Sequence, residues 1–311
     1  SACSAATAEF AASTFAAASA AASAAASAAA SAAASAAAFS LAASTISTIS
    51  TLTTPAAERS CSLASATATV TPLGLPGSAS PPHHAGRALY DLNSDEAIKT
   101  GEATEGINRV LAANWFSGAH PYLQVLTTIR AQHGPHSYPG SQLLAAETLR
   151  ATDKLHLAEL HPQEATALEY AMSPYQARCY AQEGLGLAQS LCPPMPRRGM
   201  LLIDPSYEMK SEYGTLPGFI RQIHRKWPVG IIVLWYPLLT TGMHHSMLRE
   251  LEHSCPEALR HEVAFPPART GHKMIGSGLF VINPPFALAP EAARLSRCFK
   301  KYQSQQPGET K

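Results

Sequence analysis

The residues best suited to chemistry stand at the end of an apolar run. Residues 200–203 are apolar, and Asp204, Pro205, Ser206 and Tyr207 follow them at once. Such a run is typical of a buried parallel strand, and α/β proteins bind ligands at the carboxyl ends of these strands. The Asp204 carboxylate and the neighbouring backbone carbonyl can accept hydrogen bonds from an amino group, and the Tyr207 ring can stack on a base. The tetrapeptide therefore predicts a site for the amino group of a nucleobase.

Two more acids follow predicted strands in the same way. Glu159 stands near the end of the run that begins at residue 154, and Glu183 with Gly184 follows the next run. At strand ends, one acid commonly binds ribose hydroxyls, and another can accept a hydrogen bond from an adenine amino group. The three acids in this order suggest a cofactor that carries adenosine. For each acid alone, the alternative is an ordinary surface turn.

The elements that would position these acids alternate between helices and strands after residue 90. Apolar runs predict strands at 154–160, 177–181, 200–204, 231–236, 259–265 and 279–283. Amphipathic spacing and the capping residues Ser94 and Ser141 predict helices at 91–113, 120–132, 141–150, 162–172, 215–225 and 243–253. The glycine-rich turn 271–278 should make the last two strands an antiparallel hairpin. We predict an α/β fold with a Rossmann-like, mostly parallel sheet that has one antiparallel edge strand.

The first 82 residues have a different composition. Up to residue 80 the only charged residues are Glu9, Glu58 and Arg59, and serine recurs every fourth residue within poly-alanine at 19–35. We interpret 1–82 as a low-complexity leader, disordered or helical, that precedes a domain at 83–302 and a disordered tail at 303–311. A transit peptide is one explanation and places the protein in a plastid or mitochondrion. Otherwise we expect a cytoplasmic protein.

Cysteine, histidine and hydropathy patterns exclude several classes. The six cysteines include no CxxC pair, which indicates a reducing compartment without a structural zinc. No apolar run is suited to crossing a membrane. Neighbouring histidines on a helix face different directions, and none stands at ligand spacing from a strand-end acid, so we expect no metal. We expect a monomer.

The formal net charge of +1 gives no global attraction for nucleic acid. Contacts with RNA would therefore come from local basic patches, and candidates lie at 197–198, 221–226 and 269–273. The basic stretch 294–301 fits an amphipathic helix with a solvated face, and RNA contact is the alternative there.

A series of short motifs runs through residues 83–286: His84-Ala85-Gly86, Leu89-Tyr90-Asp91-Leu92, Lys99-Thr100-Gly101-Glu102, Gly106-Ile107, Tyr138-Pro139-Gly140-Ser141, Glu159-Leu160-His161-Pro162, Arg197-Arg198-Gly199, residues 203–209, Leu234-Trp235-Tyr236-Pro237 and Val281-Ile282-Asn283-Pro284-Pro285. In their order and spacing the chain resembles the bacterial RlmJ-type 23S rRNA (adenine-N6)-methyltransferases, which have the S-adenosylmethionine methyltransferase fold.

The resemblance implies a reaction and a set of roles. The reaction is methyl transfer from S-adenosylmethionine to the exocyclic nitrogen of an adenine in large-subunit ribosomal RNA. Asp204 matches the catalytic acid, with Pro205 and Tyr207 at the substrate. The matches to cofactor-contacting positions are His84, Ser141, Glu159, Glu183 and Gly184. Glu183 stands where an Asp is more usual, and Ser206 stands where a second proline is general.

The chain departs from the family before His84. Pro82 stands where the family has a strand-ending acid, and Arg87 and Ala88 replace small and glycine residues of a turn. A residue other than glycine at positive φ costs on the order of 1 kcal/mol, and added bulk there opposes cofactor binding. The first strand would be central in the sheet, between the strands that end at Glu159 and Asp204. Residues 66–71 could replace it, but we favour the alternative that this strand is missing.

Three functions remain open at this point. The first is the rRNA methyltransferase that the resemblance implies, and the retained acids favour it. The second is a catalytically silent RNA-binding or truncated homologue without cofactor, which the Arg87-Ala88 turn favours. The third is a DNA adenine methyltransferase, which the local chemistry permits. The adenine that would be modified is not specified by the sequence.

Overall fold

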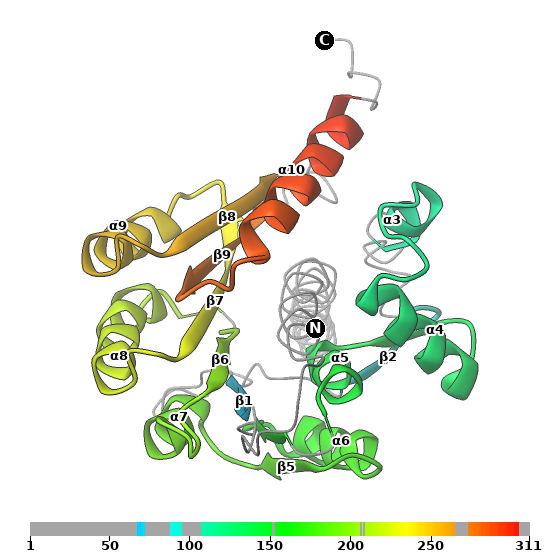
Figure 1. Ribbon diagram of the computed structural model, residues 1–311, viewed down its shortest axis with the longest axis horizontal. Helices are drawn as coiled ribbons and strands as arrows, with labels where there is room; N and C mark the ends of the chain where they lie inside the picture. The colour runs from blue at the N-terminus through cyan, green and yellow to red at the C-terminus, as the bar shows by residue number, and fades with distance from the viewer. Residues whose placement is uncertain are drawn as a thin grey trace, which may run out of the picture.

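The computed structural model of the protein describes residues 67–71, 88–94, 107–150, 153–205, 207, 209–264 and 273–304. Its centre is a seven-stranded sheet (Figure 1). In spatial order the strands are β5 (Ala177–Tyr180), β4 (Lys154–Ala158), β1 (Thr67–Thr71), β6 (Gly199–Ile203), β7 (Ile231–Leu239), β9 (Met274–Ile282) and β8 (Leu259–Ala264). All six strands expected after residue 150 are present, which confirms the predicted α/β class.

The expectation that the first strand is missing is wrong. β1 pairs in parallel with β4 on one side, where Val70 is the partner of Leu157, and with β6 on the other, where Thr71 is the partner of Ile203. Residues 67–71 therefore supply the central strand, and the predicted leader 1–82 contains part of the sheet. The physical reason is that a short β-branched segment can satisfy the backbone groups of two inner strands that would otherwise be buried and unpaired.

The position predicted for the antiparallel strand is also wrong. β9 is antiparallel to both of its neighbours, β7 and β8, and lies between them. The predicted hairpin of the last two strands is confirmed, but its second strand inserts next to β7. β8 is thereby left at the edge, running parallel to the rest. β9 is long and almost wholly buried, so an inner position covers it better than an edge would.

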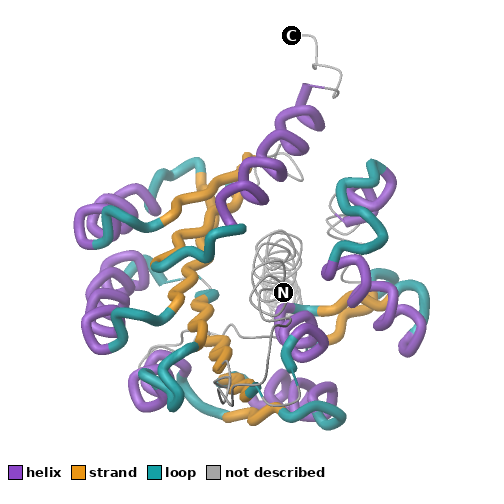
Figure 2. The backbone as a smooth tube through the Cα atoms, in the orientation of Figure 1, coloured by secondary structure: helices purple, strands orange, loops and turns teal. Residues whose placement is uncertain are grey.

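The helices cover both faces of this sheet (Figures 1 and 2). On one side lie α7 (Gly184–Leu191), α8 (Glu212–Lys226) and α9 (His244–Ser254); on the other lie α5 (Ser141–Thr148), α6 (Pro162–Met172) and α10 (Leu288–Ser304). The chain moves outward from β1 through β4 to β5, then returns through β6 to β7. Because crossovers between parallel strands are right-handed, this reversal places the two sets of helices on opposite faces. α10 extends two residues into the tail predicted at 303–311.

A segment inserted between β1 and α5 forms a separate small layer, and we call residues 88–139 the insert. It contains β2 (Leu89–Asp91), α3 (Arg109–Ala112), α4 (Pro121–His133) and β3 (Ser137–Pro139), and β2 pairs with β3 in an antiparallel manner. The helix predicted at 91–113 is wrong at its start. Asp91 ends a strand and its carboxylate accepts a hydrogen bond from the Asn93 N–H, which turns the chain. Residues 95–106 lie outside the described ranges.

Histidines rather than serines cap two of the predicted helices. Nδ1 of His120 accepts from the Tyr122 N–H at the start of α4, and His161 accepts from the Glu164 N–H at the start of α6. The predicted cap Ser141 is instead the first residue of α5. Gly140 is the N-cap, and no side chain caps that helix. Over the described ranges, no helix has the length and hydropathy needed to span a membrane.

Candidate functional site

The sheet topology brings two of the predicted acids to the same edge. Thr71 at the end of β1 is level with Ile203, and Val70 is level with Leu157, so Asp204 and Glu159 each stand one residue beyond the end of β1. They lie two strand spacings apart, which is about 10 Å. The chain reverses its direction across the sheet between β1 and β6. This is the switch point at which open α/β sheets bind ligands.

Asp204 and Pro205 form the link from β6 toward α8. Asp204 is half-buried and Pro205 is buried. The next strand, β7, continues the same register, because Ile203 pairs with Leu234 and Asp204 is therefore level with Trp235. A carboxylate in this position is reachable from the sheet edge while the backbone behind it is fixed by packing.

Tyr207 is held in a defined position by the neighbouring strand. Its hydroxyl donates a hydrogen bond to the Trp235 carbonyl at 2.8 Å, and its backbone has a φ of 56°. Its ring lies 4.7 Å from the ring of Tyr213, and 8 % of the residue is exposed. Burial, and to a smaller extent the nearby Tyr213 and Asp204, raises the pKa of Tyr207 well above its ordinary value. The hydroxyl therefore stays protonated and serves as a donor.

Two supporting residues were not found by the sequence reasoning. Nε1 of Trp235 donates to the Ser277 hydroxyl at 2.7 Å, and both residues are buried. Tyr213, from the first turn of α8, packs against Tyr207. The burial of Trp235 places it in the core behind the site. Ser277 carries no local signal, because only the β7–β9 pairing brings it to Trp235.

Glu159 is fully buried, at 0 % exposure. Its Oε1 accepts from the His161 N–H at 2.7 Å, and its own N–H donates to the Tyr180 carbonyl. A buried acid at a strand end of this kind fits the predicted cofactor contact better than a surface turn does. His161 is a helix-start residue, as we expected.

Glu183 has a structural role that the sequence reasoning did not include. It is the N-cap of α7, and its two carboxylate oxygens accept from the Leu185 and Gly186 N–H groups at 2.6 and 2.7 Å. Gly184, the other predicted contact, is the buried first residue of this helix. The cap fixes the Glu183 carboxylate at the sheet edge. Any adenine amino group would have to use its remaining acceptor positions.

Ser141 and the turn before β2 come together across the insert. Ser141 is buried directly after Gly140, whose N–H donates to the Ala88 carbonyl at 2.7 Å. A Cβ on Gly140 would lie 3.1 Å from that carbonyl, so the close approach requires glycine. Ala88 has a φ of 62°, which confirms the predicted strained turn. His84 and Arg87 lie outside the described ranges.

A metal-binding cluster and the tetrapeptide that begins at Asn283 are two other possible sites. Within the described ranges, no cluster of three or more His, Cys, Asp or Glu side chains could hold a metal ion. Asn283, which begins a second tetrapeptide of the Asp204 type, donates from Nδ2 to the Pro228 and Gly230 carbonyls at 2.8 and 2.7 Å. These two hydrogen bonds hold a structural turn. These contacts lie where β7 begins, at the edge opposite Asp204.

The comparisons with known proteins agree with this geometry. Residues 79–311 match the model of a family described as ribosomal RNA large subunit methyltransferase D, RlmJ. The chain belongs to this family. It is 35 % identical over 212 residues to ribosomal RNA large subunit methyltransferase J of Escherichia coli K12, covering 66 % of this chain and 74 % of that protein. It is 32 % identical over 217 residues to the Haemophilus influenzae protein of the same name, with the same coverage.

A solved structure has the same fold. Protein LPL1258 from Legionella pneumophila is 26 % identical to the chain and superimposes with a TM-score of 0.70, covering 86 % of this chain and 92 % of that one. The match confirms the Rossmann-like methyltransferase fold expected for this RlmJ-family chain.

Proposed function

We propose that the protein transfers a methyl group from S-adenosylmethionine to the N6 amino group of an adenine in 23S-type ribosomal RNA. Membership of the RlmJ family supports this proposal. So does the single observation on which it most depends: Asp204 and Pro205 stand at the switch point of the sheet, next to β1 and level with Trp235. Both acceptors then face the edge where a base and a cofactor would meet.

The donor set of the site fits an adenosine-bearing cofactor. Glu159 offers a buried carboxylate for ribose hydroxyls, Glu183 offers fixed oxygens, and Gly184 and Ser141 are buried beside helix starts. When bound, S-adenosylmethionine supplies an electrophilic methyl carbon. His84 completes the proposed contacts. Among the described residues, the positive φ of Ala88 opposes the fit.

Asp204 and Pro205 would act on the amino group of the adenine. The lone pair of this nitrogen is delocalised into the ring, which makes it a weak nucleophile. Hydrogen bonds from its two hydrogens to the Asp204 carboxylate and the Pro205 carbonyl would return electron density to nitrogen and fix its direction. After the methyl group is transferred, nitrogen carries one proton too many, and Asp204 is placed to accept it or pass it to water.

Tyr207 would contact the base after it leaves its stack. The hydrogen bond to the Trp235 carbonyl and the packing against Tyr213 fix the tilt of the ring. An aromatic ring that is already immobilised loses little further entropy when a base packs against the small part of it that is exposed. Ser277, through Trp235, supports this arrangement from β9.

The proposal is tested by measuring methyl transfer and cofactor binding separately. The substrate is 23S rRNA that lacks the modification, and S-adenosylmethionine binding is followed by calorimetry. Asp204→Ala should abolish methylation but keep most cofactor affinity, whereas Glu159→Ala should lose cofactor affinity. Glu257→Gln is the control, because Glu257 is exposed on a loop beyond α9. Unchanged turnover in Asp204→Ala would remove Asp204 from the mechanism. A wild-type chain that binds no cofactor would instead support the catalytically silent homologue.

A further inference from the structure

Charge is unevenly distributed, and α10 carries the largest local excess of cations that the structure describes on one helix. Arg294, Arg297, Lys300 and Lys301 accompany a single acid, Glu291. The helix has a formal charge of +3, while the whole chain has +1. Such clustering on one helix is the electrostatic pattern of a nucleic-acid contact.

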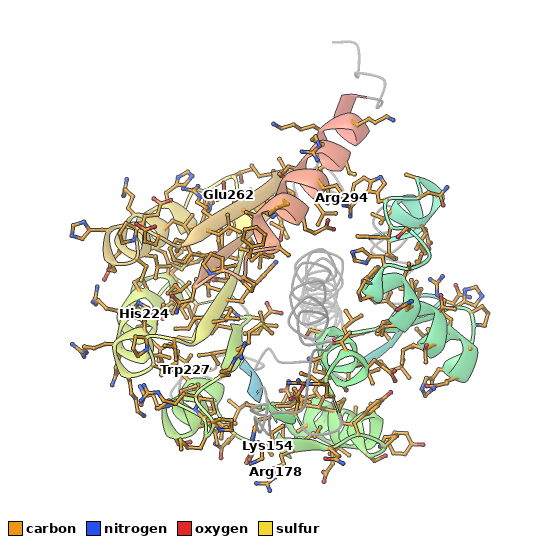
Figure 3. All side chains as sticks on the ribbon, in the orientation of Figure 1. Lys154, Arg178, His224, Trp227, Glu262 and Arg294 are labelled. Carbon is orange, nitrogen blue, oxygen red and sulfur yellow. The ribbon has the colours of Figure 1, made fainter. Side chains whose placement is uncertain are left out.

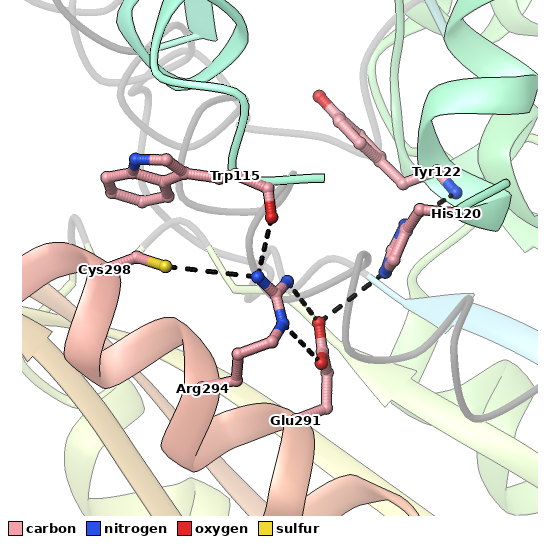
Figure 4. A network of polar contacts seen from close by, with 6 residues as sticks. All are labelled: Trp115, His120, Tyr122, Glu291, Arg294 and Cys298. Atoms are coloured by element: carbon pink, nitrogen blue, oxygen red, sulfur yellow. Dashed lines mark hydrogen bonds and ion pairs between the residues drawn. The ribbon is translucent and has the colours of Figure 1, made fainter. Parts of the chain in front are cut away.

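One of these cations is used to hold the helix in place. Arg294 points from α10 toward the insert, where its guanidinium donates to the Trp115 carbonyl at 2.6 Å and to both oxygens of Glu291 (Figures 3 and 4). Nε2 of His120 lies 3.6 Å from the same carboxylate. Arg294 and His120 lower the pKa of Glu291 to about 2, so the Glu291 carboxylate stays ionised at neutral pH.

Aromatic contacts fix the later turns of α10 to the same segment. The rings of Phe299 and Trp115 meet edge to face with centroids 4.8 Å apart. The Arg294 guanidinium lies 5.4 Å from the centre of the Phe116 ring, within the range of a cation–π contact. The part of α10 that carries the other cations is therefore immobilised beside the insert.

The other three cations face outward. Arg297, Lys300 and Lys301 are exposed, on a helix whose buried side is formed by Ala292 and Leu295. Over the part of the chain that the structure describes, no carboxylate pairs with Arg297 or Lys300. We call these three residues the basic stripe; their spacing of three and four residues places them on one surface of the helix.

The other basic patches predicted from the sequence are partly used within the fold. Arg221 pairs with Glu250 at 2.9 Å, and Lys226 donates to the Gln189 carbonyl at 2.6 Å. Arg197 donates to the Lys226 carbonyl. The patch at 269–273 lies outside the described ranges except for Lys273. Some cations of these patches are therefore occupied by contacts within the fold.

The path of α10 brings the basic stripe toward the catalytic edge. The helix begins after Asn283, beside the start of β7, and Ser296 contacts His261 in β8 at 3.0 Å. In the sheet register, His261 pairs with Leu279, and Leu279 pairs with Trp235. His261 is therefore level with Asp204. Between β6 and β8 lie three strand spacings, about 14 Å. An RNA stem that presents a base to Asp204 is wide enough to reach across this distance.

We propose that Arg297, Lys300 and Lys301 bind the phosphate backbone of the ribosomal RNA substrate and orient it over the insert. The inference rests on the proposed function, because it assigns a second contact region to the same substrate. Phosphate contacts of this kind contribute affinity and register without reading sequence.

The test compares two triple variants of equal charge. Arg297→Gln, Lys300→Gln and Lys301→Gln together remove the basic stripe; Arg198→Gln, Arg225→Gln and Arg249→Gln remove three exposed cations near or on α8 and α9. Binding of unmodified 23S rRNA is measured by filter binding without cofactor, over a series of salt concentrations. Removal of the stripe should weaken binding at least tenfold and lower the slope of log K against log salt by about 3, while the control triple changes binding less than threefold.

Steady-state kinetics and melting curves separate this role from a structural one. The stripe variant should raise KM for RNA, keep kcat at saturating RNA, and keep the wild-type melting temperature and cofactor affinity. Equal losses in both triples, or no loss in the stripe variant, would overturn the inference. The single variants Arg297→Gln and Lys300→Gln, each expected to lower the salt slope by about 1, decide the matter if the triple variant is unstable. Wild-type protein that binds RNA but never methylates it would refute the proposed function while leaving the binding comparison decisive.

Discussion

Two tetrapeptides of the same type follow strands of this sheet, and they differ in which of their side chains is buried. Asp204-Pro205-Ser206-Tyr207 follows β6, and Asn283-Pro284-Pro285-Phe286 follows β9. Both contain a residue at positive φ, 56° at Tyr207 and 54° at Asn283. In the first, the aromatic residue is buried and the polar residue is left at the sheet edge. In the second, Phe286 is 94 % exposed and the Asn283 side chain is bound to two carbonyls.

Strand direction explains the difference. β6 is parallel to its neighbours and ends at the switch point, whereas β9 is antiparallel and ends at the opposite edge of the sheet. The same residue types therefore stand at the switch point of the sheet in one case and in a packing turn in the other. A motif of this kind indicates a site only when the direction and position of its strand are known.

The largest effect expected from this comparison is on catalysis. Asp204→Asn replaces one acceptor oxygen by an amide donor that faces the hydrogens of the adenine amino group. We expect kcat to fall by roughly 10² to 10³, the range seen when a group that stabilises developing charge is lost. Asn283→Asp, the reverse exchange in the second tetrapeptide, should leave kcat unchanged. Both are measured by methyl incorporation into unmodified rRNA, and a kcat within fivefold of wild type for Asp204→Asn would contradict the assignment.

The aromatic residues of the two tetrapeptides should differ almost as clearly in stability. Tyr207→Ala removes a buried ring and its hydrogen bond to Trp235, and should lower the free energy of unfolding by about 3–5 kcal/mol. Phe286→Ala removes a ring that is mostly in solvent, and should change it by about 0.5 kcal/mol or less. Urea unfolding measures both. Similar losses in the two variants would show that Phe286 packs against something in solution.

A smaller loss of stability is expected when the hydrogen bonds of Asn283 in the second tetrapeptide are removed. Asn283→Asp removes both hydrogen bonds to the Pro228 and Gly230 carbonyls and brings a carboxylate toward them. Because Asn283 is exposed, we expect a loss of about 1–2 kcal/mol in the free energy of unfolding. Asn283→Ala is the control that lacks the repulsive charge and should lose less. A stable Asn283→Asp chain would mean that these two bonds contribute nothing to the turn.

The sequence predicted the local parts of this molecule better than the long-range ones. The strand that ends at Asp204 and the helix after His161 are encoded by contiguous apolar and capping residues, and both were predicted closely. β1 could not be assigned from residues 67–71 alone, because both strands that pair with it are distant in the sequence. The inner position of β9 and the Trp235–Ser277 contact depend on pairing between distant segments, which no local pattern specifies.

The site residues also differ in whether the local sequence could predict them. Asp204 and Glu159 could be predicted because strand ends are visible in the sequence, and the sheet brings them to one edge. The cap formed by Glu183 could have been suspected from the glycine-rich helix start that follows it, but not its use of both oxygens. Ala88 was correctly predicted to be strained from a single substitution in a turn.

The smallest expected effect is a change with pH in the stability that the Tyr207 hydroxyl contributes. The pKa of Tyr207 is raised in the folded chain, chiefly by burial, while an unfolded tyrosine titrates near pH 10. The folded state therefore holds this proton more tightly, and the stability it contributes is complete below pH 10 and is lost as the pH rises above that value.

Tyr207→Phe should cost about 1 kcal/mol at pH 8, by loss of the hydrogen bond to Trp235. This difference from wild type should shrink in urea unfolding between pH 10 and 11. Phe286→Tyr places a hydroxyl in solvent and should show no such dependence. A gap between wild type and Tyr207→Phe that stays constant with pH would mean that the Tyr207 hydroxyl is as accessible as one on residue 286, and the two tetrapeptides would then differ only in position.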